Sequence, residues 1–248
     1  MSDMKREALL RVEGLSGRRL KRPSDRVQPR ELVFEGLSFS AAAGERLAIV
    51  AEPGGAKTAL LRTVAMLQRP ASGRVFFEGR DIVRLGGGEL RRLRQRLQYV
   101  GGDPRYLLPL AQTMGQALLE PLQIHALGTP AEQQSRAEAA ASLLGVSRLL
   151  LDRKVSQISP ALRQRVALAR ALTLQPRLFL CDELIDRLEG AAARPLLELV
   201  EHACRTLPEP AAWIWTTSDE ELARAFSDRV LYLEAGRLAL ARQELARE

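Results

Sequence analysis

Short apolar runs that suit β-strands alternate along the chain with longer runs in which apolar residues recur at helical spacing. The clearest case begins at residue 45, where the apolar run ERLAIVAE is followed by the small residues PGGA and then by KTALLRTVAML. Apolar positions in the last run recur every three or four residues, which is the spacing of an amphipathic helix. The pattern therefore predicts a buried strand, a glycine-rich loop and a helix in direct succession.

The rest of the chain supplies further strands and helices around this unit. In the first half we predict strands at residues 9–13 and 32–40, a loop at 17–30, a hairpin at 74–82, a helix at 89–96, a strand at 97–100 and mostly helix at 112–174. In the second half, predicted strands at 177–183, 211–217 and 229–240 alternate with predicted helices at 192–206 and 220–226. Such alternation is typical of a mostly parallel sheet with crossover helices, so we expect an α/β fold.

Composition is consistent with this class and bounds the location of the chain. The chain has 248 residues, of which 46% are hydrophobic, enough for one well-buried α/β domain with a smaller subdomain. No apolar run reaches the roughly 18 to 20 residues of a membrane-spanning helix, and the N-terminal MSDMKREALL lacks the apolar core of a signal peptide. We therefore expect a cytoplasmic chain. Cys181 and Cys204 lack CxxC spacing, so we expect two buried thiols and neither a disulfide nor a metal site.

The net charge of +7 raises nucleic acid and anionic membrane surfaces as partners to consider. The densest basic runs are GRRLKRPSDRVQPR and ELRRLRQR, and neither has the interleaved aromatic residues of a base-stacking surface. Aromatic residues make up 4% of the chain, so we do not expect a nucleic-acid partner. Solvated loop and helix faces explain the charge, and contact with phosphate or lipid is the alternative.

The glycine-rich loop is a candidate phosphate-binding loop. Such loops need glycine because backbone N–H groups close around phosphates, and the full pattern is GxxxxGK[ST]. Residues 51–58 read AEPGGAKT, so Ala51 and Ala56 replace both motif glycines, whereas Gly54, Gly55, Lys57 and Thr58 remain in the loop and at the helix start. The strict pattern fails, but the position between a buried strand and an amphipathic helix is the context in which the motif has meaning.

If the loop binds phosphate, Lys57 would bridge the β- and γ-phosphates and the Thr58 hydroxyl would bind Mg²⁺. Ala56 would weaken binding if its position requires a left-handed backbone, because alanine there costs about 1–2 kcal/mol more than glycine. The alternative is a helix that merely begins with Lys-Thr after a turn of small residues.

Two adjacent carboxylates follow the predicted strand at 177–183. Asp182 and Glu183 stand at its C-terminal end, where open α/β sheets bind their ligands. Asp182 would support Mg²⁺ through the water shell of the metal, and Glu183 would orient and deprotonate an attacking water. A strand that ends in solvated acids is the simpler alternative, so this signal depends on the loop upstream.

The order of these features resembles the nucleotide-binding subunits of ABC transporters, over nearly the whole length from Leu9 to Leu240. In particular it is similar to the branch that imports oligopeptides, dipeptides and nickel, together with Sap-type peptide importers. Two runs carry this likeness most specifically: ELRRLRQRLQYVGGDPRYLLPLAQTMGQALLEPL, and RQRVALARALTLQPRLFLCDE, which looks like a signature helix that runs into the Walker B strand. The loop AEPGGAKTALLR and the run SDRVLYLEAGRL agree in order and spacing.

The resemblance implies a P-loop fold of the ABC type, with a mostly parallel sheet, an antiparallel β subdomain and an inserted helical subdomain. It implies an ATP-binding core at residues 1–103 and 176–248, and a helical subdomain that bears the signature at 104–175. Further implications are ATP and Mg²⁺ as cofactors, integral membrane subunits and a second nucleotide-binding subunit as partners, and a peripheral location on the cytoplasmic face of the membrane. We expect the C-terminal extension of some peptide importers to be absent or very short.

Several positions depart from the family pattern around ATP. The Q-loop glutamine falls on Gly102, the D-loop aspartate on Glu189 and the switch histidine on Ser218. The signature LSGGQ reads ISPAL from residue 158, so Ser159 alone is retained as a contact to the γ-phosphate of the partner's ATP. No aromatic residue for adenine stacking is evident after Leu15 and Ser16.

These departures predict weak catalysis. A positioned acid or base contributes about 10² to 10⁴ in rate, although such losses do not simply add. The resemblance therefore implies an ATP-binding subunit with slow hydrolysis, in which Glu183 is the catalytic base. Two alternatives stay open: a pseudo-ATPase that docks on membrane partners with little nucleotide binding, and an ABC-like protein that acts outside transport.

Overall fold

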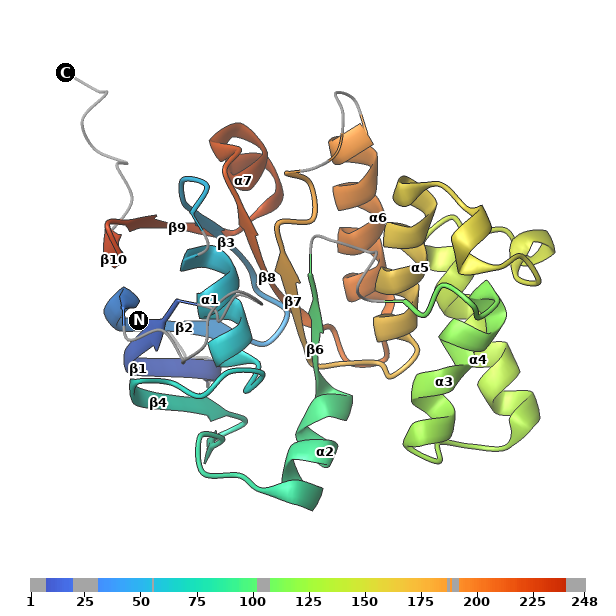
Figure 1. Ribbon diagram of the computed structural model, residues 1–248, viewed down its shortest axis with the longest axis horizontal. Coiled ribbons are helices and arrows are strands. Elements are labelled where there is room, and N and C mark those ends of the chain that lie inside the picture. The colour runs from blue at the N-terminus through green and yellow to red at the C-terminus, as the bar shows by residue number, and fades with distance from the viewer. Residues whose placement is uncertain are drawn as a thin grey trace, which may run out of the picture.

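The computed structural model describes residues 8–19, 31–54, 56–101, 108–186, 188 and 192–239. Its strands are β1 (Ala8–Arg18), β2 (Leu32–Ala42), β3 (Arg46–Val50), β4 (Ser72–Phe77), β5 (Arg80–Asp81), β6 (Leu97–Val100), β7 (Leu178–Asp182), β8 (Ala212–Thr217), β9 (Arg229–Glu234) and β10 (Arg237–Ala239). Its α-helices are α1 (Ala56–Val64), α2 (Gly87–Arg96), α3 (Met114–Ile124), α4 (Pro130–Leu143), α5 (Pro160–Leu172), α6 (Ala193–Thr206) and α7 (Glu220–Phe226). The predicted α/β class is confirmed (Figure 1).

The larger sheet has the strand order β10-β9-β3-β8-β7-β6. Neighbours from β9 to β6 are parallel, and only β10 runs antiparallel, against β9, among the described strands of this sheet. Parallel strands are covered on both faces and therefore read as nearly continuous apolar runs. This explains why the apolar stretches of β3, β7 and β8 could be recognised in the sequence.

Alternate side chains of the larger sheet enter two separate cores. On β8, Trp213 and Trp215 face the core shared with α5 and α6, whereas Ile214 faces the core shared with α1. The two indole rings stack, with centroids 5.4 Å apart and planes at 17°. Both cysteines are buried and free, as expected, and burial raises the pKa of the Cys204 thiol to about 12.

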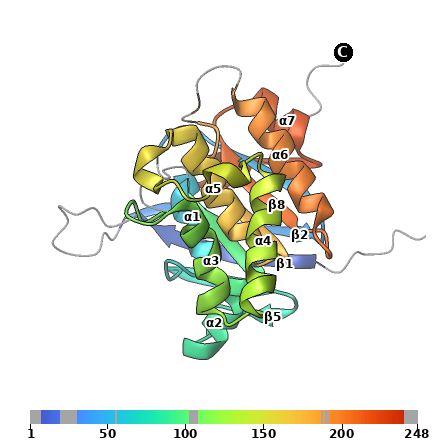
Figure 2. The same cartoon turned by 90° about the vertical axis from the view of Figure 1, so that its right-hand side faces the viewer.

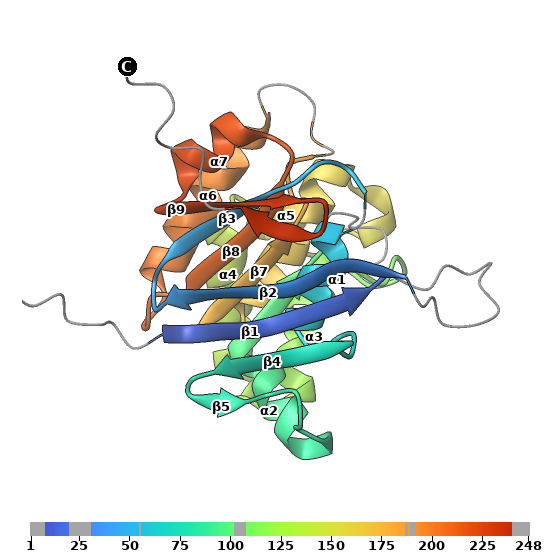
Figure 3. The same ribbon diagram turned by 90° about the vertical axis from the view of Figure 1, so that its left-hand side faces the viewer.

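An antiparallel sheet with the order β2-β1-β4-β5 covers one side of the molecule (Figure 3). The predicted hairpin corresponds to β4 and β5, which pair antiparallel. The predicted loop at 17–30 begins too early, because β1 continues to Arg18, where Gly17 still pairs with Phe34 and Arg18 with Leu32. Residues 20–30 of that loop lie outside the described residues.

Helices α3, α4 and α5 pack together at the end of the molecule opposite the antiparallel sheet (Figures 1 and 2). Two short 3-10 turns, η2 (Arg148–Leu150) and η3 (Val155–Gln157), connect α4 to α5. Helices therefore make up most of residues 112–174, and that prediction is confirmed. Thr113 and Thr129 form capping boxes that fix the starts of α3 and α4. None of the described helices combines the length and apolar character needed to cross a bilayer.

Candidate functional site

The candidate phosphate loop lies between β3 and α1, as predicted, and Ala56 already belongs to the helix. Ala56 begins α1 and is not among the residues with positive φ, so the left-handed strain considered for alanine does not arise. A side chain at Gly54 would meet nothing within 4 Å, and its φ is not positive, so this structure does not require glycine there. Gly55 lies outside the described residues.

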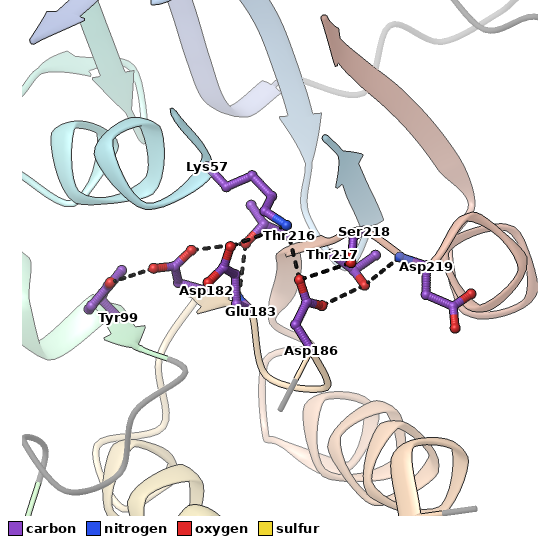
Figure 4. A network of polar contacts seen from close by, with 9 residues as sticks. All are labelled: Lys57, Tyr99, Asp182, Glu183, Asp186, Thr216, Thr217, Ser218 and Asp219. Atoms are coloured by element: carbon purple, nitrogen blue, oxygen red, sulfur yellow. Dashed lines mark hydrogen bonds and ion pairs between the residues drawn. The ribbon is translucent and has the colours of Figure 1, made fainter. Parts of the chain in front are cut away.

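Lys57 is fully buried at the start of α1, and its ammonium group is held by two carboxylates (Figure 4). Its Nζ lies 2.9 Å from Oδ2 of Asp186 and 3.1 Å from Oε1 of Glu183. A buried charge needs a partner because removal from water disfavours the charged form. In this arrangement the protein itself supplies the counter-ions that phosphates would supply in a nucleotide complex.

Asp182, the last residue of β7, accepts hydrogen bonds from the hydroxyl groups of Thr216 and Tyr99. The Thr216 hydroxyl lies 3.0 Å from Oδ1 and the Tyr99 hydroxyl lies 2.9 Å from Oδ2, and the Thr58 side chain lies beside the same carboxylate. Burial raises the pKa of Asp182, and the hydrogen bonds from these hydroxyls counteract that rise. The structure thus brings Thr58 and Asp182, both predicted as Mg²⁺ ligands, close together at the C-terminal end of the strand.

Glu183 adopts a backbone conformation that is uncommon for a residue with a side chain. Its φ is +51°, in the left-handed region, and its N–H donates to the Thr216 hydroxyl at 3.0 Å. The amide group of Gln164, on α5, donates to the Leu184 carbonyl and holds the same turn. Because the Glu183 carboxylate pairs with Lys57, it is not free to act as a general base in this arrangement.

Asp186 is a site residue that the sequence reasoning missed. Besides Lys57, it accepts a hydrogen bond from the Thr217 hydroxyl at 2.8 Å and one from the Ser218 hydroxyl at 3.4 Å. Thr217 ends β8 and Ser218 follows it, so Asp186 joins α1 to the end of β8 (Figure 4). β7 and β8 are parallel neighbours, and their C-terminal ends meet at one edge of the sheet. This arrangement is the feature from which Asp186 could have been predicted.

Tyr99 and Thr216 were also missed, and both lie on strands that flank β7. Tyr99 is on β6 and Thr216 on β8, each hydrogen bonded to Asp182. Burial and the Asp182 charge raise the pKa of Tyr99, so its hydroxyl stays protonated and donates. Their polar side chains at strand ends next to Asp182 could have been found once the strand order was known.

Ser159 is not part of this network in the described residues. It is the N-cap of α5, where its hydroxyl accepts a hydrogen bond from the Leu162 N–H at 3.3 Å, and Pro160 occupies the first helical position. Serine before proline is a favourable helix start. The predicted Q-loop position Gly102 and D-loop position Glu189 lie outside the described residues.

A cavity of about 710 Å³ opens beside the phosphate loop. It is lined by the loop residues Val50 to Pro53, by Ala56, by Ser218 and Glu220, and by residues 232–236 of β9 and the turn that follows. The lining includes Glu52, Glu220 and Glu234, and the Glu220 carboxylate is paired with Arg224.

The residues present fit Mg²⁺ better than they fit free phosphates. Thr58 and Asp182 offer adjacent oxygen ligands, and Mg²⁺ is usually held by one or two protein carboxylates together with substrate phosphates. No cluster of three or more histidine, cysteine or acidic residues suited to a metal was found among the described residues. Phosphate oxygens would have to compete with Glu183 and Asp186 for Lys57.

Comparison with known proteins agrees with the geometry. The family model for ABC transporters matches residues 34–186. A Brucella ovis protein described as a peptide import ATP-binding protein is 32% identical over 206 residues, which cover 83% of this chain and 64% of that protein. The chain therefore spans less than two thirds of the length of this relative.

Two solved structures share the fold. The chain of cbiO1 from Clostridium perfringens, part of the ABC transporter complex cbiONQ, superposes with a TM-score of 0.78 at 24% identity, over 94% of this chain and 88% of that chain. The ATP-binding cassette MJ0796, in a dimeric post-hydrolysis state with ADP and Pi, superposes with a TM-score of 0.77 at 22% identity, over 92% of this chain and 96% of that chain. At these identities the likeness concerns the fold. Together with the family match, it shows that the chain belongs to the ABC transporter family and adopts the fold of its ATP-binding cassettes.

Proposed function

We propose that this chain is an ATP-binding subunit of an ABC importer of the peptide or nickel type, and that it binds Mg·ATP weakly and hydrolyses it slowly. The proposal is carried by the convergence of Lys57, Thr58, Asp182 and Glu183 at the C-terminal edge of the parallel sheet. The name of the Brucella relative, a peptide import ATP-binding protein, supports the substrate class.

Each of these residues has a task that its chemistry suits. Lys57 would bind phosphate oxygens, and Thr58 and Asp182 would hold Mg²⁺, which would supply positive charge to neutralise the phosphates. Glu183 orients the attacking water and accepts its proton. Because Glu183 is paired with Lys57, it must leave the ammonium group before it can take this role.

Slow turnover follows from the side chains at the neighbouring positions. Ser218 has a short neutral hydroxyl where the family has a histidine, and that hydroxyl already donates to Asp186. Gly102 has no side chain with which to orient a water molecule. Ser159 caps α5, so its hydroxyl is engaged within its own helix. We propose that Ser159 makes a weak contact to the ATP of a partner chain. This contact requires that its hydroxyl first release the Leu162 N–H.

We propose that the chain docks on integral membrane subunits at the cytoplasmic face of the membrane and pairs with a second nucleotide-binding subunit. We assign residues 1–103 and 176–248 to the ATP-binding core and 104–175 to a helical subdomain. The packing of α3, α4 and α5 against one another supports this division, and the dimeric state of the MJ0796 cassette supports the pairing.

A second candidate is a pseudo-ATPase that docks on membrane partners with little or no nucleotide binding. One observation favours it: Lys57 is fully buried and neutralised by two carboxylates, so the fold does not need phosphate to satisfy this cation. The two candidates differ in whether the isolated chain binds Mg·ATP at physiological concentrations.

Thermal unfolding with and without Mg·ATP distinguishes the two candidates. A ligand at about 100 times its dissociation constant adds about 2.7 kcal/mol, which raises the midpoint of a domain of this size by about 5–10 °C. Lys57→Ala should remove this shift, and Lys154→Ala, which replaces an exposed lysine before η3, should retain it. Each variant is compared with its own ligand-free midpoint, because the loss of Lys57 also changes basal stability.

The outcomes separate clearly. A shift in the wild type and in Lys154→Ala that is absent in Lys57→Ala supports an ATP-binding subunit. If millimolar Mg·ATP leaves the wild-type midpoint unchanged, the ATP-binding proposal fails for the isolated chain and the pseudo-ATPase takes its place.

A further inference from the structure

Asp186 lies where groups that could bind a terminal phosphate converge. One oxygen of its carboxylate lies 2.9 Å from Nζ of Lys57 and 3.4 Å from the Ser218 hydroxyl, and the other accepts from the Thr217 hydroxyl at 2.8 Å (Figure 4). These donors come from two elements, the start of α1 and the end of β8. All three donors bind the carboxylate of Asp186, an anionic group that belongs to the chain itself.

The same donors would serve a terminal phosphate of a bound nucleotide. The lysine of a phosphate loop reaches the β- and γ-phosphates, whereas backbone N–H groups of the loop hold the phosphates closer to the nucleoside. The Asp186 carboxylate resembles a phosphate in being a compact anion with several acceptor positions. Its side chain is 14% exposed, so this anion is partly withdrawn from water and its charge is incompletely screened.

A phosphate and this carboxylate cannot share the donors. Two like charges within about 4 Å of each other repel strongly in a partly desolvated site. A terminal phosphate would therefore have to displace Asp186 from Lys57, Thr217 and Ser218 together. A nucleotide that ends at the β-phosphate could bind the N–H groups of the loop. It would have no γ-phosphate to place beside Thr217 and Ser218.

We infer that Asp186 competes with the terminal phosphate of a nucleoside triphosphate, so that this site favours a nucleoside diphosphate. The inference rests on the proposed function, since it concerns the nucleotide that this site would take. Asp186 is thus a specificity-determining residue, and the Glu183 pairing leaves Lys57 with a counter-ion even when Asp186 is displaced.

Equilibrium titrations with Mg·ADP and Mg·ATP test this inference through dissociation constants measured by calorimetry. The proteins are the full chain and its Asp186→Asn and Asp186→Ser variants. Asp186→Asn retains an oxygen that accepts from Thr217 and removes the charge, and Asp186→Ser removes both. Either variant should bind Mg·ATP at least about tenfold more tightly than the wild type, a change of about 1.4 kcal/mol, with a gain for Mg·ADP below about threefold.

Glu220→Gln is the matched control. Glu220 lines the same cavity beside Ser218 but pairs with Arg224 and Tyr232, so its replacement removes one negative charge without a change at Lys57. This variant should leave the ratio of the ADP and ATP dissociation constants unchanged. A change of that ratio in Glu220→Gln as large as in the Asp186 variants would attribute the effect to overall charge and overturn the inference.

The remaining outcomes separate this inference from the proposed function. If the affinities for ADP and ATP rise equally in the Asp186 variants, or do not rise, the proposed competition between Asp186 and the terminal phosphate is wrong. Nucleotide binding itself would still stand. An affinity for Mg·ATP that rises about tenfold in the Asp186 variants, while the affinity for Mg·ADP changes less than about threefold, supports the inference. If neither nucleotide binds to any of these proteins at millimolar concentration, the inference and the proposed nucleotide binding are both wrong.

Discussion

The Nζ atom of Lys57 lies 2.9 Å from Oδ2 of Asp186, and this contact connects the first turn of α1 to the turn after β7. Asp186 also accepts from the Thr217 hydroxyl, so the contact extends to the end of β8. The start of α1 is therefore fixed to the strand edge by ionic contacts within the chain. On the proposed function, a nucleotide would have to replace these contacts, so the stability of the ligand-free protein and its affinity for nucleotide would be opposed here.

Replacement of Lys57 by alanine should destabilise the protein even without nucleotide. The substitution leaves Glu183 and Asp186 close together without their cation, and loss of one partner of a buried pair costs about 3–5 kcal/mol. Partial exposure of both carboxylates favours the lower end of this range. Urea denaturation measures the change, and the double variant Lys57→Ala with Asp186→Ser should recover part of it. A single variant as stable as the wild type would contradict the burial argument.

Replacement of Asp182 by asparagine should stabilise the ligand-free protein. Burial raises the pKa of Asp182 in the fold above its unfolded value, so the folded state binds the proton more tightly. Protonation therefore stabilises the fold at low pH, and that stabilisation is lost as the pH rises through the folded pKa. At pH 7 we expect Asp182→Asn to add about 0.5–2 kcal/mol to the free energy of unfolding.

The advantage of Asp182→Asn should shrink as the pH falls toward the raised pKa of the wild-type carboxyl. Urea denaturation at several pH values measures it. The variant should also lose any stabilisation of the wild type by Mg²⁺. An advantage that stays constant over the whole pH range would show that the ionisation of Asp182 is not its cause.

Replacement of Ser159 by alanine should lower stability through loss of a helix cap. An N-cap serine is worth about 1 kcal/mol, which corresponds to about 2–4 °C in the midpoint for a domain of this size. Ser159→Asp retains a capping oxygen and should keep the wild-type midpoint. Differential scanning calorimetry measures all three proteins. If Ser159→Ala melts with the wild type, the hydroxyl does not act as a cap.

The ion pair of Arg46 and Asp228 should contribute to the free energy of unfolding with a pH dependence opposite to that of Asp182. Hydrogen bonds from the Arg46 guanidinium, at 2.6 and 3.2 Å, lower the pKa of Asp228 below its unfolded value of about 3.9. The stabilisation is present above the unfolded pKa and is lost as the pH falls through the folded pKa. Asp228→Asn should therefore cost up to about 1 kcal/mol at pH 7, because this half-exposed pair is screened, and almost nothing near pH 2. Denaturation at both pH values measures the difference.

The sequence predicted the elements of the fold well because its signals were local. The apolar run before the glycine-rich loop corresponds to β3, and the periodic run after the loop corresponds to α1. A strand buried on both faces is apolar throughout, whereas a helix buried on one face is apolar at every third or fourth position. The early start predicted for the loop at 17–30 was wrong. The proline-containing basic segment suggested a loop from Gly17 onward, but the pairing of Gly17 and Arg18 with β2 overrides local preference.

The candidate site was predictable in part for the same reason. Lys57, Thr58, Asp182 and Glu183 follow from a motif order along the chain. Asp186 does not, because its role depends on the turn after β7, which places its side chain beside Lys57 of α1 and Thr217 of β8. The positive φ of Glu183 has no signature in the sequence either, since the surrounding contacts impose it. Whether Gly54, Lys57, Thr58 and Ser159 contact nucleotide remains a prediction.

The stacked tryptophans of β8 make the site observable without a label. Trp213 and Trp215 are the two tryptophans of the chain, both are fully buried, and Thr216 and Thr217 directly follow them in the sequence. Near-ultraviolet circular dichroism depends on fixed aromatic packing, and these two coupled indoles would contribute much of that signal. Any movement of the β8 end when Asp186 releases Thr217 would change the geometry of this pair. A change in this spectrum on addition of nucleotide would thus report on one strand, next to the residues proposed to contact the phosphates.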